Sequence, residues 1–142
     1  MADDDPNDVA LVARLFTDAR LLNTLQVVSS GEKSIQYLAG VRDFADRQKY
    51  PFPSLLLLDL KMPGKNGFDV LSWLLDHPES RPASVVVLAT NGELKDINLA
   101  YQLGANSFLV KPMELEEFLN LLNGLKGARM HSSGAGRTLE FA

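Results

Sequence analysis

Two residues able to do chemistry, Asp59 and Lys111, each lie at the end of a short apolar run. Asp59 follows the leucines of 54–60 (SLLLLDL), and Lys111 follows 107–110 (SFLV). Strands that are apolar throughout are typical of a parallel sheet, whose carboxyl ends meet at one edge and form the ligand crevice. A lone aspartate there is more commonly a turn cap, and a lysine before a proline is about as often a plain surface residue. Together they predict a carboxylate and an ammonium in one crevice.

Acidic residues open the chain, which begins MADDDPNDVALV. Acidic residues this close to a terminus usually form a solvated tail. Here they lead into a helical pattern, and Asp5 is suited to cap a helix whose first turn contains Pro6. Asp3 and Asp4 are then free for another role. Clustered carboxylates repel one another, so these two side chains are suited to attract a cation. This acidic cluster is therefore either a solvated tail or one half of a functional site.

Short apolar runs alternate with helical patterns along the chain. The alternation predicts right-handed βαβ crossovers and a doubly wound α/β fold with a parallel sheet. The helix that starts at residue 31 either ends at Ala39 or continues through Arg47. The expected strands are 25–30, 54–60, 84–89 and 107–110. The expected helices begin at Pro6, cover 31–39, 66–77 and 93–103, and begin again near Glu114. The alternation therefore starts with a helix, and the strand expected in front of that helix is missing.

Length and composition exclude several classes of protein. With 142 residues, 46% hydrophobic and 23% charged, the chain has the size and composition of one ordinary globular domain. No apolar run approaches about 18 residues and no secretory signal is visible, so we expect no membrane partner. The absence of cysteine excludes disulfides and thiolate chemistry and fits a cytoplasmic protein. A net charge of −4 with scattered basic residues argues against nucleic acid as a partner.

Over about residues 3–126 the chain resembles the receiver domain of two-component response regulators. Three motifs in order carry the likeness: the acidic pair Asp3 and Asp4, the loop DLKMPGKNG that begins at Asp59, and the segment GANSFLVKP that contains Lys111. The resemblance implies a flavodoxin-like sheet of strand order 2-1-3-4-5. It also implies a bacterial-type phosphorelay protein that is not an enzyme beyond its own phosphorylation and slow self-dephosphorylation.

The resemblance implies a role for each matching residue. Asp59 accepts a phosphoryl group from a sensor histidine kinase or a phosphotransfer protein, and Lys111 pairs with Asp59 or with the phosphoryl oxygens. A magnesium ion is held by Asp4 and Asp59, by Asp3 through water, and by the main-chain carbonyl of Lys61. Such a set of oxygen ligands suits Mg²⁺.

Partners follow from the same likeness. The long segment 41–53 is similar to that of small receivers that pair with bacteriophytochrome-type kinases. The tail 127–142 is too short for a DNA-binding domain, so we expect the output to pass through contact with a downstream protein partner.

Ala89 departs from the family pattern. The family places a threonine or serine at the end of the fourth strand, and counting without gaps from Asp59 and Lys111 places Ala89 there. The neighbouring Thr90 is offset by one residue, which turns its side chain to the other face of a strand. Phe108 matches the family's switch aromatic but is equally explained as a core residue. Phosphorylation is expected without the hydroxyl, whereas the strength of switching stays open.

The missing strand raises a second question, because strand 1 lies inside a sheet of order 2-1-3-4-5 and the first two residues cannot form it. An empty position leaves backbone groups unpaired on two neighbouring strands. We therefore divide the chain into a receiver domain (1–126), a linker (127–136) and a C-terminal segment, RTLEFA (137–142). This segment fills the position in cis, swaps into a second molecule to form a dimer, or is an unstructured tail. Glu140 argues against burial on both faces of a sheet.

Three rival functions differ in the residues that they require. A hydrolase of the haloacid dehalogenase type also uses an aspartate at a strand end, but it needs a second aspartate two residues later, where Lys61 stands. A dinucleotide-binding enzyme needs a glycine-rich turn, which is absent. A receiver-like module that binds a partner without phosphorylation is the serious alternative, because Ala89 leaves room for it.

Overall fold

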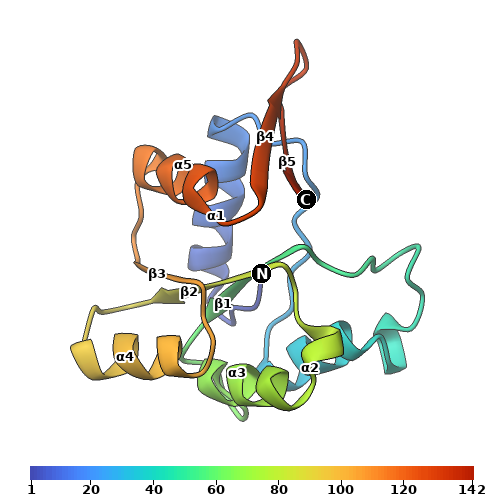
Figure 1. Cartoon of the computed structure of the whole chain (residues 1–142), viewed down its shortest axis with the longest axis vertical. Helices are drawn as coiled ribbons and strands as arrows, with labels where there is room; N and C mark the ends of the chain where they lie inside the picture. The colour runs from blue at the N-terminus through green and yellow to red at the C-terminus, as the bar shows by residue number, and fades with distance from the viewer.

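A parallel sheet forms the centre of the structure, a computed structural model that describes all residues 1–142 (Figure 1). Its strands are β1 (Leu55–Asp59), β2 (Ser84–Ala89) and β3 (Ser107–Val110), in the order β1-β2-β3. Every residue of β2 is buried, which explains why its sequence is apolar throughout and does not alternate. The three strands expected in these regions are therefore confirmed.

Helices cover both faces of this sheet, as a doubly wound fold requires (Figure 1). One face carries α1 (Pro6–Asp18) and α5 (Leu115–Gly124), and the other carries α2 (Gly31–Ala39), α3 (Gly67–Asp76) and α4 (Leu94–Gln102). Side chains of β1 alternate between two core clusters. Leu56 and Leu58 pack with the α3 side chains, while Leu57 packs with Phe118 and Leu122 of α5.

Capping residues fix where the helices begin. Asp5 caps α1 as expected, and its side chain accepts a hydrogen bond from the Asn7 backbone N–H at 2.9 Å. Asn66 and Asp69 form a reciprocal capping box at the start of α3, in which each side chain accepts a hydrogen bond from the other residue's backbone N–H. The backbone thus enters both helices directly from the edge of the sheet where the acidic residues lie.

The continuation of α2 through Arg47 is wrong. Gly40 adopts a left-handed conformation with φ 67° and ends the helix, and a short 3₁₀ turn, Arg42–Phe44, follows. The Arg47 guanidinium then folds back and donates to the carbonyls of Tyr37 and Leu38 at 2.8 and 3.0 Å. Segment 41–53 is therefore anchored to the end of α2 by a side chain rather than by helical backbone bonds.

The first three residues occupy the end of a strand position between β1 and residue 28. Ala2 makes parallel bridges to both Val28 and Leu58, so the neighbours along the hydrogen bonds are Val28, Ala2, β1, β2 and β3. The Ala2 N–H donates to Leu57 at 2.8 Å, and the Asp3 N–H donates to Val28 at 3.0 Å. The strand expected at 25–30 is reduced to this bridge.

The C-terminal segment does not complete the parallel sheet, and this expectation is wrong. Residues 128–132, assigned to a linker, form β4 (Ala128–Ser132), which pairs antiparallel with β5 (Arg137–Phe141). The hairpin stands on the α1 and α5 side of the molecule (Figure 1). Its alternating pattern keeps Glu140 exposed and 3.1 Å from His131, whereas a central strand would bury that carboxylate. A dimer formed by exchange of this segment stays a prediction.

Asn23 holds the hairpin against the rest of the chain. Its side-chain amide donates to the Leu139 carbonyl at 2.9 Å and accepts from the Leu139 N–H at 2.8 Å. Arg137 bonds through its backbone to Arg20 and to Leu22, each at 2.7 Å. These bonds give β5 a fixed parallel neighbour outside the main sheet.

Burial of the Met1 amine predicts a pH dependence of stability. The amine donates to the Gln26 carbonyl at 2.8 Å, and burial lowers its pKa from 8.0 to about 5. Between these values the unfolded chain holds a proton that the folded chain does not, so the free energy of unfolding rises with pH from about 5 to 8. The rise is roughly 4 kcal/mol at most, at 1.36 kcal/mol per pH unit. Urea unfolding across this range measures it, and the Nα-acetylated protein should lose this part of the slope; equal slopes would contradict the prediction.

Candidate functional site

Lys111 is the centre of an ion-pair cluster at the carboxyl edge of the sheet. Its ammonium donates to the carboxylates of Asp8, Asp3 and Asp59 at 2.8, 3.1 and 3.1 Å. Asp59 is the last residue of β1, Lys111 follows β3, and Asp3 follows the Ala2 bridge. The structure thus brings Asp59 and Lys111 together in one crevice, as the strand ends predicted.

The cluster is almost closed to solvent. Asp3 and Asp59 are 2% and 4% exposed, and the Lys111 side chain is 7% exposed. Burial raises the pKa of Asp59, and the positive charge of Lys111 partly offsets that rise. Burial alone would lower the pKa of Lys111, but the hydrogen bond that its ammonium donates to Asp8 and the negative charge of Asp59 raise the pKa above its ordinary value. The ammonium is therefore fully charged at neutral pH.

Asp8 is the site residue that the sequence did not indicate. It lies in the first turn of α1 and makes the shortest bond to Lys111, with its own side chain 27% exposed. The sequence feature that could have indicated Asp8 is its position one helical turn after Asp4 and Asp5, on a helix that starts at the acidic edge of the sheet. Its partner is 103 residues away, so no local pattern reveals the contact.

Replacing Asp8 by Asn should lower the free energy of unfolding by about 1–2 kcal/mol, because a charge-assisted bond to a buried ammonium becomes a neutral one. Two carboxylates still hold Lys111, which limits the loss. Asp18→Asn is the matched control on the same helix, since Asp18 makes only an exposed pair with Arg14 at 3.9 Å and should change stability by less than about 0.5 kcal/mol. Urea unfolding compares the two; equal losses would contradict the assignment.

Three carboxylates form a group suited to a cation. Ligand atoms of Asp3, Asp4 and Asp59 lie within 4.8 Å of one another, and Asp4 is exposed. Asp4 and Lys61 line an open cleft of about 740 Å³ beside the buried pair. Hard oxygen donors with one solvent-facing side match the ligands that Mg²⁺ takes in proteins. A role for the Lys61 carbonyl in holding a cation stays a prediction.

The strand next to Asp59 offers no hydroxyl at its end. Ala89 is 5% exposed, packs in the core on the α3 side, and accepts the Lys111 backbone N–H at 2.7 Å. Thr90 follows β2 and is exposed. Phe108 is half-buried and packs against the same core cluster. Ala89 thus stands at the end of the strand, with Thr90 after it, as the spacing in the sequence indicated. The roles of Ala89, Thr90 and Phe108 in switching stay predictions.

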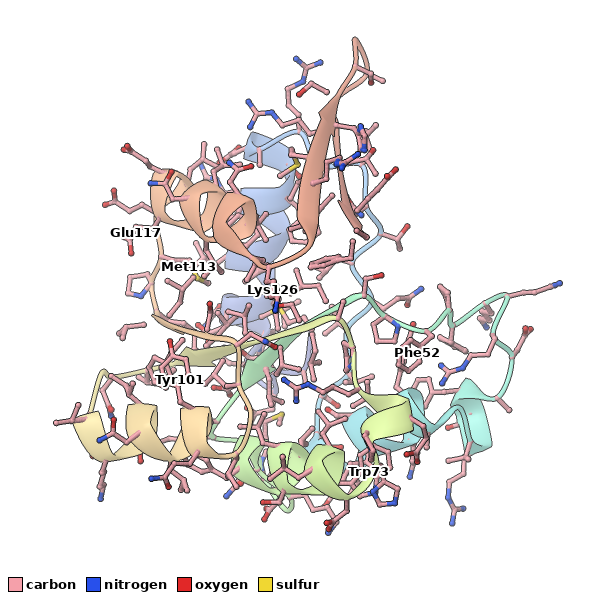
Figure 2. The ribbon with its side chains drawn as sticks, viewed as in Figure 1. Phe52, Trp73, Tyr101, Met113, Glu117 and Lys126 are labelled. Carbon is pink, nitrogen blue, oxygen red and sulfur yellow. The ribbon has the colours of Figure 1, made fainter.

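The wider surroundings of the site consist of packed core. Met113, two residues after Lys111, is 2% exposed and packs with Phe118, while Trp73 lies apart from it on α3 (Figure 2). Trp73 is half-buried and its ring stacks on His77 with centroids 4.2 Å apart. None of the helices is long and apolar enough to cross a bilayer.

The fold and the site together define a doubly wound α/β domain with a carboxylate–lysine pocket at the carboxyl edge of a parallel sheet. The family model described as the response regulator receiver domain matches residues 1–123. The chain belongs to this family of two-component response regulator domains. Receiver domains of this kind interact with histidine kinases or phosphotransfer proteins.

Several known proteins are similar over most of the chain. Response regulator Rcp1 of Synechocystis is 26% identical, with 89% of this chain and 84% of Rcp1 covered. The nitrate/nitrite regulator NarL of Escherichia coli is 32% identical over 95% of this chain and 57% of NarL. Among solved structures, RPA3017, a response regulator in red light signaling of R. palustris, has a TM-score of 0.76 with 34% identity, covering 87% of both chains. The Mn²⁺-bound form of Rcp1 has a TM-score of 0.71 with 26% identity, covering 89% of this chain and 88% of Rcp1.

Proposed function

We propose that this chain is a phosphoacceptor receiver that takes a phosphoryl group onto Asp59. The observation that carries the proposal is the buried ammonium of Lys111, held 3.1 Å from the Asp59 carboxylate inside a cluster of further carboxylates. Phosphoryl transfer needs alignment and charge stabilisation more than covalent help. A carboxylate nucleophile with a fixed neighbouring cation supplies both.

The transfer itself balances without a further reactant. A carboxylate oxygen of Asp59 attacks the phosphorus of a phosphohistidine, the P–N bond breaks, and the imidazole nitrogen keeps the electron pair and takes a proton. The acyl phosphate on Asp59 then carries the new negative charge. Lys111 already points its ammonium at this carboxylate, and its three N–H donors can turn toward a phosphoryl oxygen.

A divalent cation, Mg²⁺, is part of the proposal. When bound, it would neutralise charge on the phosphoryl oxygens and so reduce their repulsion of the attacking carboxylate. Asp3, Asp4, Asp59 and the carbonyl of Lys61 would hold it beside the open cleft. The Mn²⁺-bound form of the similar protein Rcp1 supports a divalent ion in this type of pocket.

The partner that supplies the phosphoryl group is proposed to be a sensor histidine kinase or a phosphotransfer protein. Similarity to RPA3017 in red light signaling and to the bacteriophytochrome response regulator RtBRR supports a kinase of the phytochrome type. The output then passes to a downstream protein by surface contact inside the cell.

Incubation with acetyl phosphate and Mg²⁺ tests the proposal without the kinase. Intact-mass measurement should show one added phosphoryl group, and removal of Mg²⁺ with EDTA should prevent it. Hydroxylamine should remove the group, because it cleaves acyl phosphates. An unmodified protein under all conditions would overturn the proposal.

A second function is favoured by Ala89: binding of a partner without phosphorylation. A buried methyl group at the end of β2 offers no hydroxyl to a phosphoryl oxygen. The same mass measurement separates the two functions. An unmodified Asp59 together with tight binding to the partner kinase supports the binding module.

A further inference from the structure

Asp8 differs from the other two partners of Lys111. The ammonium has three N–H donors, and the carboxylates of Asp3, Asp8 and Asp59 accept them. Asp3 and Asp59 also belong to the group of carboxylates suited to a cation, whereas Asp8 does not. Yet the bond to Asp8, at 2.8 Å, is shorter than the two bonds of 3.1 Å. The ammonium therefore makes its shortest bond to the one acceptor outside the cation group.

The Asp8 carboxylate can reach Lys111 because another residue takes over its usual local role. Asp8 is the third residue of α1 after the cap Asp5, and in a capping box the side chain at this position accepts the backbone N–H of the cap. Here the Asp3 carboxylate accepts that N–H through Oδ1 at 3.0 Å. The first turn of a helix also favours a negative charge. The fold thus places the charge of Asp8 at the acidic edge of the sheet and leaves it to the ammonium.

The ammonium and a divalent cation compete for the same carboxylates. Lys111 bonds Asp3 through Oδ2 and Asp59 through Oδ1, and both carboxylates are nearly closed to solvent. Its positive charge takes up part of their negative charge and repels a second cation bound to them. An ammonium without its third acceptor would rely on Asp3 and Asp59 alone. The bond to Asp8 therefore draws the ammonium toward α1 and offsets its charge.

We propose that Asp8 is a positioning residue of the cation site: it holds the Lys111 ammonium on the α1 side, so that Asp3 and Asp59 keep their affinity for a divalent cation. The inference rests on the proposed function, because this cation is the one that phosphoryl transfer to Asp59 would use. Asp8 acts through Lys111 and not as a ligand of the cation. The acidic edge is thus divided into one carboxylate for the ammonium, Asp8, and a group of three for the cation.

Calorimetric titration of the full-length protein with MgCl₂ tests this role without any phosphoryl donor. Asp8→Asn should weaken Mg²⁺ binding about tenfold, because the ammonium loses its shortest charge-assisted bond and competes more strongly for Asp3 and Asp59. Asp5→Asn is the matched control, since it removes the same charge three residues away and asparagine caps a helix as well as aspartate does. It should weaken binding less than about threefold, because an exposed charge without contact to the ammonium is screened. Equal losses in the two variants overturn the proposal.

A double-mutant cycle with Lys111→Met shows whether Asp8 acts through the ammonium. Lys111→Met alone should bind Mg²⁺ at least about fivefold more tightly, because the competing positive charge is gone. Adding Asp8→Asn to Lys111→Met should change the affinity less than about threefold, since Asp8 then has no ammonium to hold. Urea unfolding checks that each variant is folded, and the comparison of Asp8→Asn with Asp5→Asn decides the question without Lys111→Met. A tenfold loss that persists without Lys111, or unchanged or weaker Mg²⁺ binding by Lys111→Met, overturns the proposal.

The role of Asp8 and the proposed function fail on different results. If acetyl phosphate leaves Asp59 unmodified while the calorimetric differences hold, the phosphoacceptor proposal is wrong and the role of Asp8 stands. If Asp59 takes up the phosphoryl group while Asp8→Asn and Asp5→Asn bind Mg²⁺ equally, the role of Asp8 alone is wrong. An unmodified protein that binds no Mg²⁺ in the titration overturns the role of Asp8 directly.

Discussion

Asp59→Asn abolishes the mass gain that acetyl phosphate and Mg²⁺ produce, because an amide cannot form the acyl phosphate. The loss should be complete, since Asp59 is the carboxylate that Lys111 holds at 3.1 Å beside the open cleft. Intact-mass measurement after equal incubation of variant and unmodified protein checks the result.

Folding does not confound this variant. Burial raises the pKa of Asp59, which means that the folded state disfavours its charged form relative to the unfolded state. Stability is therefore lost as the pH rises past the ordinary carboxyl pKa toward the folded value, and at neutral pH the neutral Asn removes this cost. Asp59→Asn should unfold at the same or a higher urea concentration than the unmodified protein.

Asp96→Asn is the matched control, because Asp96 lines the same cleft as Asp4 and carries the same charge. It should take up the phosphoryl group as the unmodified protein does. Persistent modification of Asp59→Asn would place the phosphoacceptor elsewhere, and loss of modification in both variants would show that cleft charge rather than a nucleophile was removed.

Sequence patterns predicted the parts of the molecule that depend on local periodicity or on strand ends. The apolar runs around Leu57 and Val87 predicted buried parallel strands, and two strand ends were enough to predict that Asp59 and Lys111 meet. Asp5 was recognisable as a helix cap because capping is a local interaction. Each of these features depends on residues close together in sequence or on a general rule of parallel sheets.

The features that sequence did not predict depend on contacts over long distances. Asp8 belongs to the site only because α1 starts at the edge where Lys111 emerges, 103 residues later. The hairpin was missed because Gly127 and the glycines and serines of 132–136 suggested a linker. Alternation of Ala128 and Met130 with polar residues was the available signal, and only one face of this hairpin packs on the core.

The strand expected at 25–30 shows a different limit. Its sequence favours an extended conformation, but a strand in the middle of a sheet also needs two neighbours. Val28 has such a neighbour in Ala2, whereas Thr24 and Gln26 form no β-bridge. The availability of a neighbouring strand, which no propensity of the segment itself indicates, therefore decides whether this segment pairs.

Lys111→Met should lower the free energy of unfolding by about 3–5 kcal/mol, because it leaves buried carboxylates without their cation. Asp3 and Asp59 are both nearly closed to solvent and have no other basic side chain within ion-pair distance. Urea unfolding at neutral pH measures the loss. Lys126→Met is the control, since Lys126 is exposed after α5 (Figure 2) and its replacement should cost less than about 0.5 kcal/mol.

The cause of the loss can be separated from the loss of side-chain packing. Without Lys111 the pKa of Asp59 rises further, since burial then acts without the offsetting positive charge. An acid with a raised folded pKa stabilises the folded state as the pH falls, so Lys111→Met should recover stability between pH 7 and pH 5 relative to the unmodified protein. Adding Asp59→Asn to Lys111→Met should recover part of the loss at neutral pH by removing one of the unpaired charges. A loss that is independent of pH and unchanged by the second substitution would show that Lys111 contributes by packing rather than by charge.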